Sequence, residues 1–283
     1  MTDLLTQWLN EITPGSGLTP SQHRVEAVIV GNQQLAAYSE ISAIASRAMV
    51  NASTVVRYAK ALGFRGWPDL QNELRGRYLA GLTSEETLDQ RRSAGQGHMH
   101  TAVRRDIENL QRTLVSLDVA EGEATIAAFA GAKRIIVLGL GSMSGPAVVL
   151  SHLGAVIGYP VSLHTSPGPN LAAALAGTGP GDVLVVVNVW RPMRDVVAAQ
   201  RAASQLGATV VAITDMRRGS IAANADHVLA VSSEGVSFFS SVTAATSVIY
   251  GLLGGMEAAQ SERSRSSLRR TQQQWDQIDV FTT

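Results

Sequence analysis

The stretch RIIVLGLGSMSGPAVVL, residues 134–150, decides the fold of the second half of the chain. It begins as a strand buried on both faces, continues through a glycine-rich turn, and ends in an apolar segment that suits a helix. Four more short apolar runs follow, YPVSLH, DVLVVVNV, ATVVAITD and DHVLAVSS, and they alternate with helix-prone segments. Strands that alternate with helices form a parallel sheet. We therefore predict a three-layer α/β domain with a five-stranded parallel sheet over residues 124–262.

The same region contains no charged residue between Ile135 and Gly181, which raises the alternative of a membrane span. Such a span needs roughly 18 or more consecutive apolar residues. Gly139, Gly141 and Pro146 interrupt the apolar run, so a buried strand, turn and helix explain it better and no membrane contact is expected. The first ten residues lack a basic stretch ahead of an apolar one, and the chain has no cysteine. We expect a cytoplasmic protein.

Residues 41–57, ISAIASRAMVNASTVVR, have the spacing of a helix-turn-helix. The first helix places Ile41, Ile44 and Ala45 on one face, and Asn51 can cap the second helix with its side chain. Residues 40–77 contain six basic and three acidic residues, a local charge of +3 in a chain whose net charge is zero. Phosphate contacts need such cations, although a small helical bundle with a solvated basic face has the same pattern. The candidate DNA-binding residues are Asn51, Ser53, Thr54, Arg57, Tyr58 and Lys60.

The run STVVRYAKALGFRGWPDLQNEL, Ser53–Leu74, closely resembles the signature of RpiR-type transcriptional regulators. The resemblance implies an all-α, DNA-binding helix-turn-helix domain, which we place at residues 1–80. Two positions depart from the pattern. Met49 stands where a turn glycine is common, at a strain of about 1 kcal/mol if its φ is positive. Asn51 stands where serine is usual, but asparagine can also cap a helix.

RpiR-type regulators carry a sugar isomerase (SIS) domain after the DNA-binding part, and residues 124–262 resemble one. The resemblance rests on the succession of strands, on the loop Gly139–Ser144, and on ITDMRRGSIAANADHVL, Ile213–Leu229. Residues 81–123 are then a polar linker and a bridging helix from about His100 to Leu117. Residues 263–283 form a C-terminal tail or helix, since RSRSSLRRTQQQWDQIDVF resembles the last helix of the family.

The glycine-rich loop after the first strand suits an anion, because the following helix presents free N–H groups there. Gly141, Ser142 and Ser144 are therefore candidate ligand-binding residues. A dinucleotide site has a similar loop, but its third glycine would fall at Ser144. No acidic residue ends the second strand to hold a ribose, because Ser162 and His164 stand there. We expect no dinucleotide or other cofactor.

The loop after the third strand, Asn188–Asp195, departs most from the SIS pattern. SIS domains usually place a serine-rich turn here whose hydroxyls hold a ligand phosphate, but this loop contains no Ser, Thr or Gly. Arg191 and Arg194 can bind phosphate or carboxylate through their guanidinium groups, although both also suit a solvated surface. Asn188, Arg191, Ser220 and Glu234 complete the candidate ligand-binding set. We expect a small anionic metabolite as effector, a sugar phosphate or a sugar acid. The altered loop leaves another phosphorylated metabolite, or no ligand, as alternatives.

An aldose-ketose isomerase needs a positioned base, and Glu234, His152 and His164 are the candidates. The altered phosphate loop and the preceding DNA-binding part argue against catalysis, so no catalytic residue is assigned. The histidines lack the spacing of a metal site. We predict a regulator that binds a palindromic duplex operator as a homodimer or higher oligomer and senses an anionic metabolite. The alternative is a sugar-phosphate isomerase with an N-terminal assembly domain.

Overall fold

The computed structural model describes residues 4–13, 17–91 and 97–282. The chain divides into two compact units, unit 1 over Met1–Gln90 and unit 2 over Arg91–Thr283.

Unit 1 is helical, as the sequence predicts. Its helices pack around one apolar core that includes Val25, Ile29, Ile44 and Leu70. The predicted capping box begins the second helix, where Thr19 N donates to Gln22 Oε1 at 2.8 Å and Gln22 N donates to Thr19 Oγ1 at 3.4 Å. The helices are α1 (Leu4–Ile12), α2 (Pro20–Gly31), α3 (Gln33–Tyr38), α4 (Ile41–Arg47), α5 (Ala52–Ala61), α6 (Trp67–Gly81) and α7 (Ser84–Arg91).

Helix α7 corrects one expectation, because it lies within the polar stretch that we predicted to be a linker. The reason is a second capping box: Thr83 N donates to Glu86 Oε2 at 2.6 Å, and Glu86 N donates to Thr83 Oγ1 at 3.1 Å. These local bonds favour a helix without an apolar period. Residues 92–96 of the predicted linker lie outside the described residues.

Unit 2 contains the predicted five-stranded sheet, and every neighbouring pair of strands is parallel. The order across the sheet is β2-β1-β3-β4-β5. The chain therefore leaves β1 toward one edge of the sheet and returns to add β3 on the other side of β1. The strands are β1 (Arg134–Leu138), β2 (Val161–His164), β3 (Asp182–Val187), β4 (Thr209–Thr214) and β5 (His227–Ala230).

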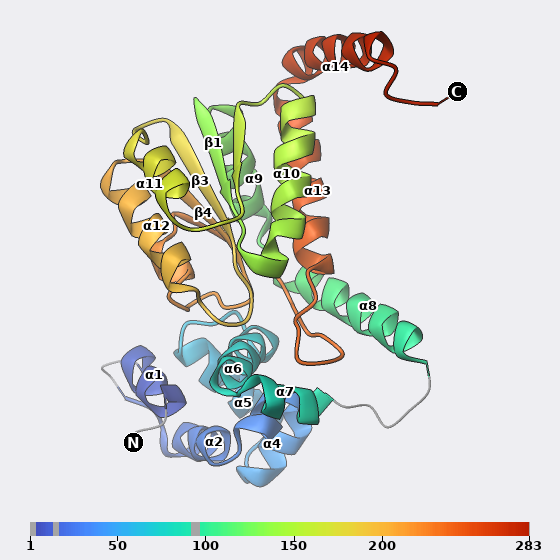
Figure 1. Cartoon of the computed structure of the whole chain (residues 1–283). Coiled ribbons are helices and arrows are strands. Elements are labelled where there is room, and N and C mark those ends of the chain that lie inside the picture. Colours follow the sequence, from blue (N-terminus) through green and yellow to red (C-terminus); the bar gives the residue numbers. More distant parts are fainter. Residues whose placement is uncertain (1–3, 14–16, 92–96, 283) are drawn as a thin grey trace. The chain divides into compact units, whose positions relative to one another are not determined.

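Helices cover both faces of the sheet, as Figure 1 shows, so unit 2 has the three layers that the sequence predicts. One apolar core joins the sheet to α9 (Val119–Ala130), α10 (Ser144–Val156) and α13 (Thr243–Ala259). A second core joins the opposite face to α11 (Pro169–Ala176) and α12 (Arg194–Gln205). β3 is buried along its whole length because it lies at the centre of the sheet.

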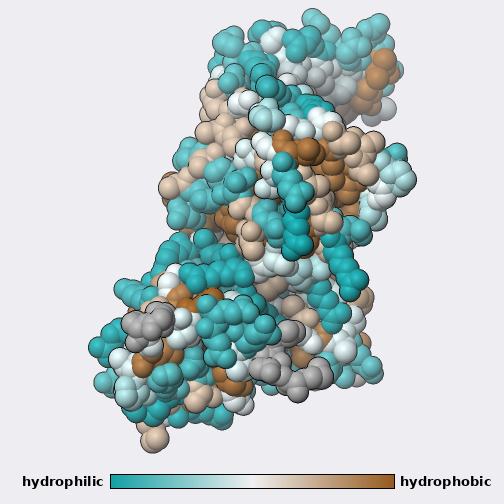
Figure 2. Space-filling view, turned by 90° about the vertical axis from the view of Figure 1, so that its left-hand side faces the viewer, coloured by the Kyte–Doolittle hydropathy of each residue, from teal (hydrophilic) through white to brown (hydrophobic). Residues whose placement is uncertain are grey.

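Two further helices flank these layers. α8 (His98–Ser116) is the long helix expected near residues 100–117, and α14 (Ser261–Gln277) shows that the C-terminal tail is helical. The surface at the top of Figure 2, where α14 lies, is mostly hydrophilic. Within the described residues, no helix combines the length and the apolar character that a membrane crossing requires.

Candidate DNA-reading helix and effector site

The turn between α4 and α5 contains the position where the sequence departs from a usual glycine. Met49 has a φ of 51°, in the left-handed region, so the predicted strain is present at this residue. The turn is closed by Val50 N, which donates to Ala45 O at 2.9 Å, and by Met49 N, which donates to Ser46 O at 3.1 Å. The Met49 side chain is 80% exposed, so no packing within the chain compensates for the strain.

α5 begins at the predicted place, with Asn51 at the N-cap position. The Asn51 carbonyl accepts a hydrogen bond from Thr54 N at 2.8 Å, but its side chain makes no capping bond. The expectation of a side-chain cap is therefore wrong. The Asn51 side chain is exposed.

α5 has one polar, exposed side and one buried side. Ser53, Arg57 and Lys60 are exposed, together with Asn51. Val55 and Ala59 are fully buried, as the helical spacing predicts. The exposed side chains, which include two cations, lie within the first three turns of the helix and offer hydrogen-bond donors to a groove or to phosphates.

The sequence interpretation was wrong about the exposure of Thr54 and Tyr58. Tyr58 is fully buried and Thr54 is 7% exposed, because both lie beside Val55 on the side of α5 that faces the core. Burial raises the pKa of Tyr58 far above its usual value, and the nearby carboxylate of Glu26 raises it further. In this structure Tyr58 is a core residue that stays protonated.

Thr54 contacts a candidate DNA-binding residue directly. Its Oγ1 accepts a hydrogen bond from Arg57 Nη2 at 3.0 Å, one turn along the helix. Arg57 is also anchored through its backbone, since Gln22 Nε2 on α2 donates to Arg57 O at 3.5 Å. Thr54 therefore restricts the rotamers of an exposed arginine, a positioning role that the sequence interpretation did not assign.

In unit 2, the candidate effector site lies at the carboxyl edge of the parallel sheet. The direction of the chain switches between β1 and β3, and ligands of open α/β sheets bind outside the carboxyl ends at such a point. The loop after β1 has Gly141 at φ 59° and exposed Ser142, followed by half-buried Ser144 at the start of α10. A Cβ on Gly139 would lie 2.4 Å from Met143 O, so only glycine permits this tight passage.

The loop after β3 lies on the other side of the switch point and is held by its own side chains. Asn188 is buried; its Nδ2 donates to Arg191 O at 3.1 Å and its Oδ1 accepts from Met193 N at 3.3 Å. Trp190 has a φ of 70°, and its N donates to Asp215 Oδ2 at 2.8 Å. The Asn188 side chain therefore shapes the loop, which limits its role in contacting a ligand.

Arg191 and Arg194 are both exposed at this edge. The Arg191 guanidinium lies over the Trp190 ring, 4.8 Å from its centroid, and this stacking orients the side chain. Arg194 is the first residue of α12, and Asp195 in the same turn is also exposed. Arg191 is thus the arginine of this loop whose side chain is oriented by stacking on a neighbouring ring.

Ser220 and Glu234 lie beyond β4 and β5, two and three strands away from β1. Ser220 is exposed. Glu234 is buried, and its Oε1 lies 3.4 Å from Arg91 Nη2. Its N donates to Asn109 Oδ1 at 3.2 Å, and its O accepts from Asn109 Nδ2 at 2.8 Å. Glu234 therefore lies just beyond the fifth strand, as the sequence predicts, but its backbone and side chain are already bonded to Asn109 on α8 and to Arg91.

The sequence interpretation missed Asp215, the residue directly after β4. Its Oδ2 accepts hydrogen bonds from Trp190 N at 2.8 Å and from Ser233 Oγ at 2.6 Å. It thereby joins the loops that follow β3, β4 and β5. A carboxylate directly after a buried strand was the available signal, because the ends of parallel strands meet at one edge.

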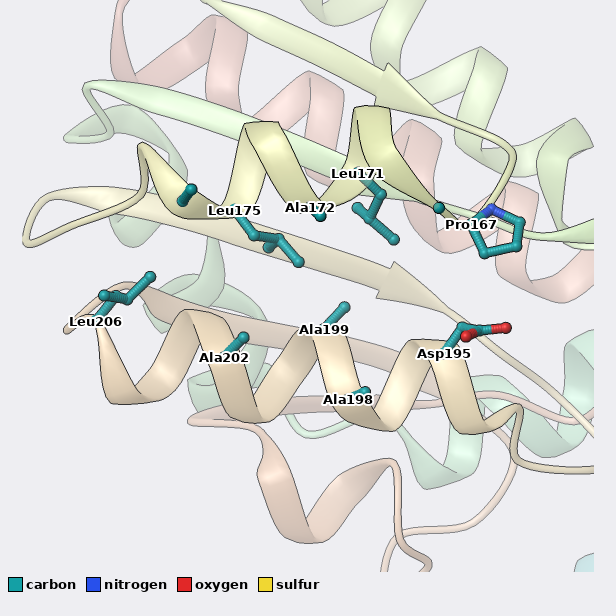
Figure 3. A pocket seen from close by; sticks show the side chains of 11 residues that line it. Pro167, Leu171, Ala172, Leu175, Asp195, Ala198, Ala199, Ala202 and Leu206 are labelled. Atoms are coloured by element: carbon teal, nitrogen blue, oxygen red, sulfur yellow. The ribbon is translucent and has the colours of Figure 1, made fainter.

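An apolar groove of about 530 Å³ lies between α11 and α12, and Figure 3 shows its side chains. Leu171 and Leu175 on α11 face Ala199 and Ala202 on α12. The lining carries one charged residue, the anionic Asp195. The groove lacks the cations that an anionic effector needs, so the loops at the switch point fit such a ligand better.

Comparison with known families gives one match in each of the two units of the chain. Residues 6–81 match the family described as "Helix-turn-helix domain, rpiR family", and residues 128–253 match the family described as "SIS domain". A solved sugar isomerase domain of an RpiR transcription factor from Sphaerobacter thermophilus is 33% identical, with a TM-score of 0.60. The match covers 62% of this chain and 97% of that one. The chain belongs to the RpiR family of transcriptional regulators.

A second solved structure aligns with nearly the whole chain. The Vibrio vulnificus NanR protein, solved in complex with ManNAc-6P, aligns with a TM-score of 0.63 at 18% identity. That match covers 99% of this chain and 100% of NanR. This likeness shows a shared fold. The predicted family, fold class and regulator architecture are confirmed.

Proposed function

We propose that this RpiR-family protein binds a palindromic DNA operator as a dimer, reading bases with α5. The observation that carries the proposal is the two-sided character of α5, with Ser53, Arg57 and Lys60 exposed over a buried apolar face. A recognition helix needs such an outward polar side, and a dimer mirrors the symmetry of an inverted repeat.

A selection from a random duplex pool tests this function on the full chain. We expect the retained duplexes to contain inverted repeats with half-sites about one helical turn, or a multiple of it, apart. Affinity for the selected duplex, measured by fluorescence anisotropy, should fall steeply with salt. The double variant Ser53→Ala, Arg57→Ala should lose about 10-fold or more, and the α12 variant Arg201→Ala should retain wild-type affinity. Equal loss in both variants would remove α5 from the interface.

We further propose that the SIS domain senses a small anionic metabolite at the switch point between β1 and β3. Support comes from the N-terminus of α10 behind Gly141, Ser142 and Ser144, and from Arg191 across the switch point. NanR, a regulator of the same fold, was solved with ManNAc-6P. The loop Asn188–Asp195 contains no hydroxyl side chain, so here a guanidinium replaces the usual hydroxyl contacts, which suits a sugar phosphate or a sugar acid.

A thermal-shift screen tests the effector class. The panel consists of hexose and hexosamine phosphates, aldonic acids, inorganic phosphate and the corresponding neutral sugars. We expect phosphorylated or acidic sugars to raise the melting temperature and the neutral sugars to leave it unchanged. A response to neutral sugars alone would contradict an anion site.

The architecture is that of a regulator, and we propose that the SIS domain has no isomerase activity. Of the three candidate bases, Glu234 is buried against Arg91, and His152 is exposed on α10. His164 ends β2, where its backbone carbonyl accepts from Gly139 N at 3.1 Å. Incubation of each panel sugar phosphate with the protein, followed by chromatography, should return the sugar unchanged.

A further inference from the structure

The turn between α4 and α5 carries two exposed side chains that the packing of unit 1 does not explain. Met49 is 80% exposed and has a φ of 51°, a left-handed conformation that strains a residue with a Cβ. Asn51 is exposed at the N-cap position of α5, and its side chain makes no capping bond. These are also the two positions at which the sequence departs from the glycine and the serine that are usual in this turn.

The backbone of the turn is fixed by hydrogen bonds, so both side chains project from a rigid support. Arg24 on α2 donates from Nε to Ala48 O at 3.1 Å. Thr54 N donates to Asn51 O at 2.8 Å at the start of α5. Both bonds use backbone oxygens of the turn as acceptors. A recognition site needs groups that are held in place before the ligand arrives, and this turn meets that condition.

The residues on either side of the turn suit a DNA strand. Arg47, the last residue of α4, is exposed and provides a cation for a phosphate. Ala52, the first residue of α5, is exposed and has a small side chain that leaves room beside Asn51. Ser53 and Arg57 follow on the exposed side of the same helix. The turn therefore continues the surface that we propose to read bases.

We propose that Asn51 reads an adenine of the operator and that Met49 packs against the C5-methyl group of a neighbouring thymine. The inference rests on the proposed reading of DNA by α5 and deepens it. The Asn51 amide carries a donor and an acceptor side by side, and adenine presents the matching N7 acceptor and N6 donor in the major groove. A phosphate offers acceptors alone, so it would use only the amide nitrogen.

The exposed methionine of the turn suits the thymine methyl, which is the apolar group of the major groove. A methionine side chain is flexible and polarizable, so it can adapt to the irregular surface of stacked bases. Strained backbone is found where function maintains it. Glycine at position 49 would release the strain but would also remove the only atoms that can reach the methyl group. The strain at Met49 thus accompanies a contact that glycine cannot make.

Selection from a random duplex pool, run in parallel on the wild type and two variants of the full chain, locates the adenine. We expect the wild type and Asn10→Ser to enrich the same half-site. Asn51→Ser should enrich that half-site without the adenine preference at one position, because the hydroxyl cannot bond N7 and N6 together. Asn10 is exposed on α1, so it provides a matched control in the same unit.

Modified bases in the selected duplex then test each contact by fluorescence anisotropy. Replacing the adenine by 7-deazaadenine removes the N7 acceptor, and we expect the wild type and Asn10→Ser to lose about 3- to 10-fold in affinity. Asn51→Ser should bind both duplexes equally. Replacing the neighbouring thymine by uracil removes only the methyl group. This change should weaken the wild type by about 2- to 4-fold and should leave Met49→Gly unaffected. Circular dichroism checks that the variants are folded.

An adenine preference that persists in Asn51→Ser would overturn the reading by Asn51, as would an equal effect of 7-deazaadenine on this variant and the wild type. A loss in Asn51→Ser of the same size on every duplex would place the amide on a phosphate and would also overturn it. A uracil effect that persists in Met49→Gly, or that the wild type lacks, would overturn the methyl contact. All of these results leave the proposed function standing, because a wild type that enriches no half-site is the distinct outcome that removes both.

Discussion

Arg57 Nη2 donates a hydrogen bond to Thr54 Oγ1 across 3.0 Å, so a buried threonine holds an exposed arginine on α5. Replacing Thr54 by valine keeps the shape of the side chain and removes the acceptor. We expect Thr54→Val to weaken operator binding by about 0.5 to 1.5 kcal/mol, since Arg57 must then be ordered by the DNA alone. The measurement is fluorescence anisotropy on the selected duplex. In the background Arg57→Ala the same substitution should have no further effect on affinity, and an additive loss would contradict the coupling.

The raised pKa of Tyr58 predicts how unit 1 responds to alkaline pH. In the unfolded chain the phenol ionises near pH 10, but in the folded protein it stays protonated. Above about pH 10 this group therefore lowers stability by up to about 1.4 kcal/mol per pH unit. Below that pH its contribution is fully present. Tyr58→Phe removes this contribution to the pH dependence of stability. Between about pH 9 and pH 11 the variant should therefore lose less of its free energy of unfolding than the wild type does.

Urea unfolding at several pH values measures this difference. Tyr250→Phe, at an exposed position on α13, serves as the control and should follow the wild type at every pH. Identical pH profiles for Tyr58→Phe and the wild type would show that the phenol ionises in the folded state. Operator affinity near pH 7 should be unchanged in Tyr58→Phe, because the side chain does not reach the surface.

Met49 offers a stabilising substitution. Its φ of 51° strains a residue with a Cβ, and its side chain is mostly exposed. Met49→Gly should raise the free energy of unfolding of unit 1 by up to about 1 kcal/mol, since glycine adopts this conformation without strain. Met49→Val, a β-branched change at the same φ, should lower it. Thermal unfolding measures both variants, and a loss of stability in Met49→Gly would show that the strain is small.

Arg191 is the cation on which the effector proposal depends. Arg191→Ala should weaken binding of the best metabolite from the screen by about 10- to 100-fold, the effect of losing a charge-assisted contact. Operator affinity without the metabolite should stay at the wild-type level. Isothermal titration calorimetry measures the first quantity and anisotropy the second. Arg201→Ala on α12 is the matched control. Wild-type metabolite affinity in Arg191→Ala would remove this residue from the site.

The sequence predicted the layers, the five strands and the helix-turn-helix because each depends on local apolar periodicity. The exposure of Thr54 and Tyr58 was mispredicted, since the packing of α5 into the core of unit 1 decides which flank of the helix is covered. The burial of Glu234 could not be predicted for a similar reason: its partner Asn109 lies 125 residues earlier in the chain. Hydrogen bonds over such separations leave no trace in a single sequence. α7 is a different case, because Thr83 and Glu86 have the spacing of a capping box although the segment has no apolar period.

Asp215 receives hydrogen bonds from the loops after β3 and β5 at a single carboxylate oxygen. The segment after β5 is in turn bonded to Asp106, Asn109 and Thr113 of α8. A metabolite bound at the proposed site that displaced Trp190 would therefore perturb a continuous chain of polar contacts that ends on α8. The proposed effector site and α8 are thereby connected through side-chain hydrogen bonds of residues far apart in the sequence.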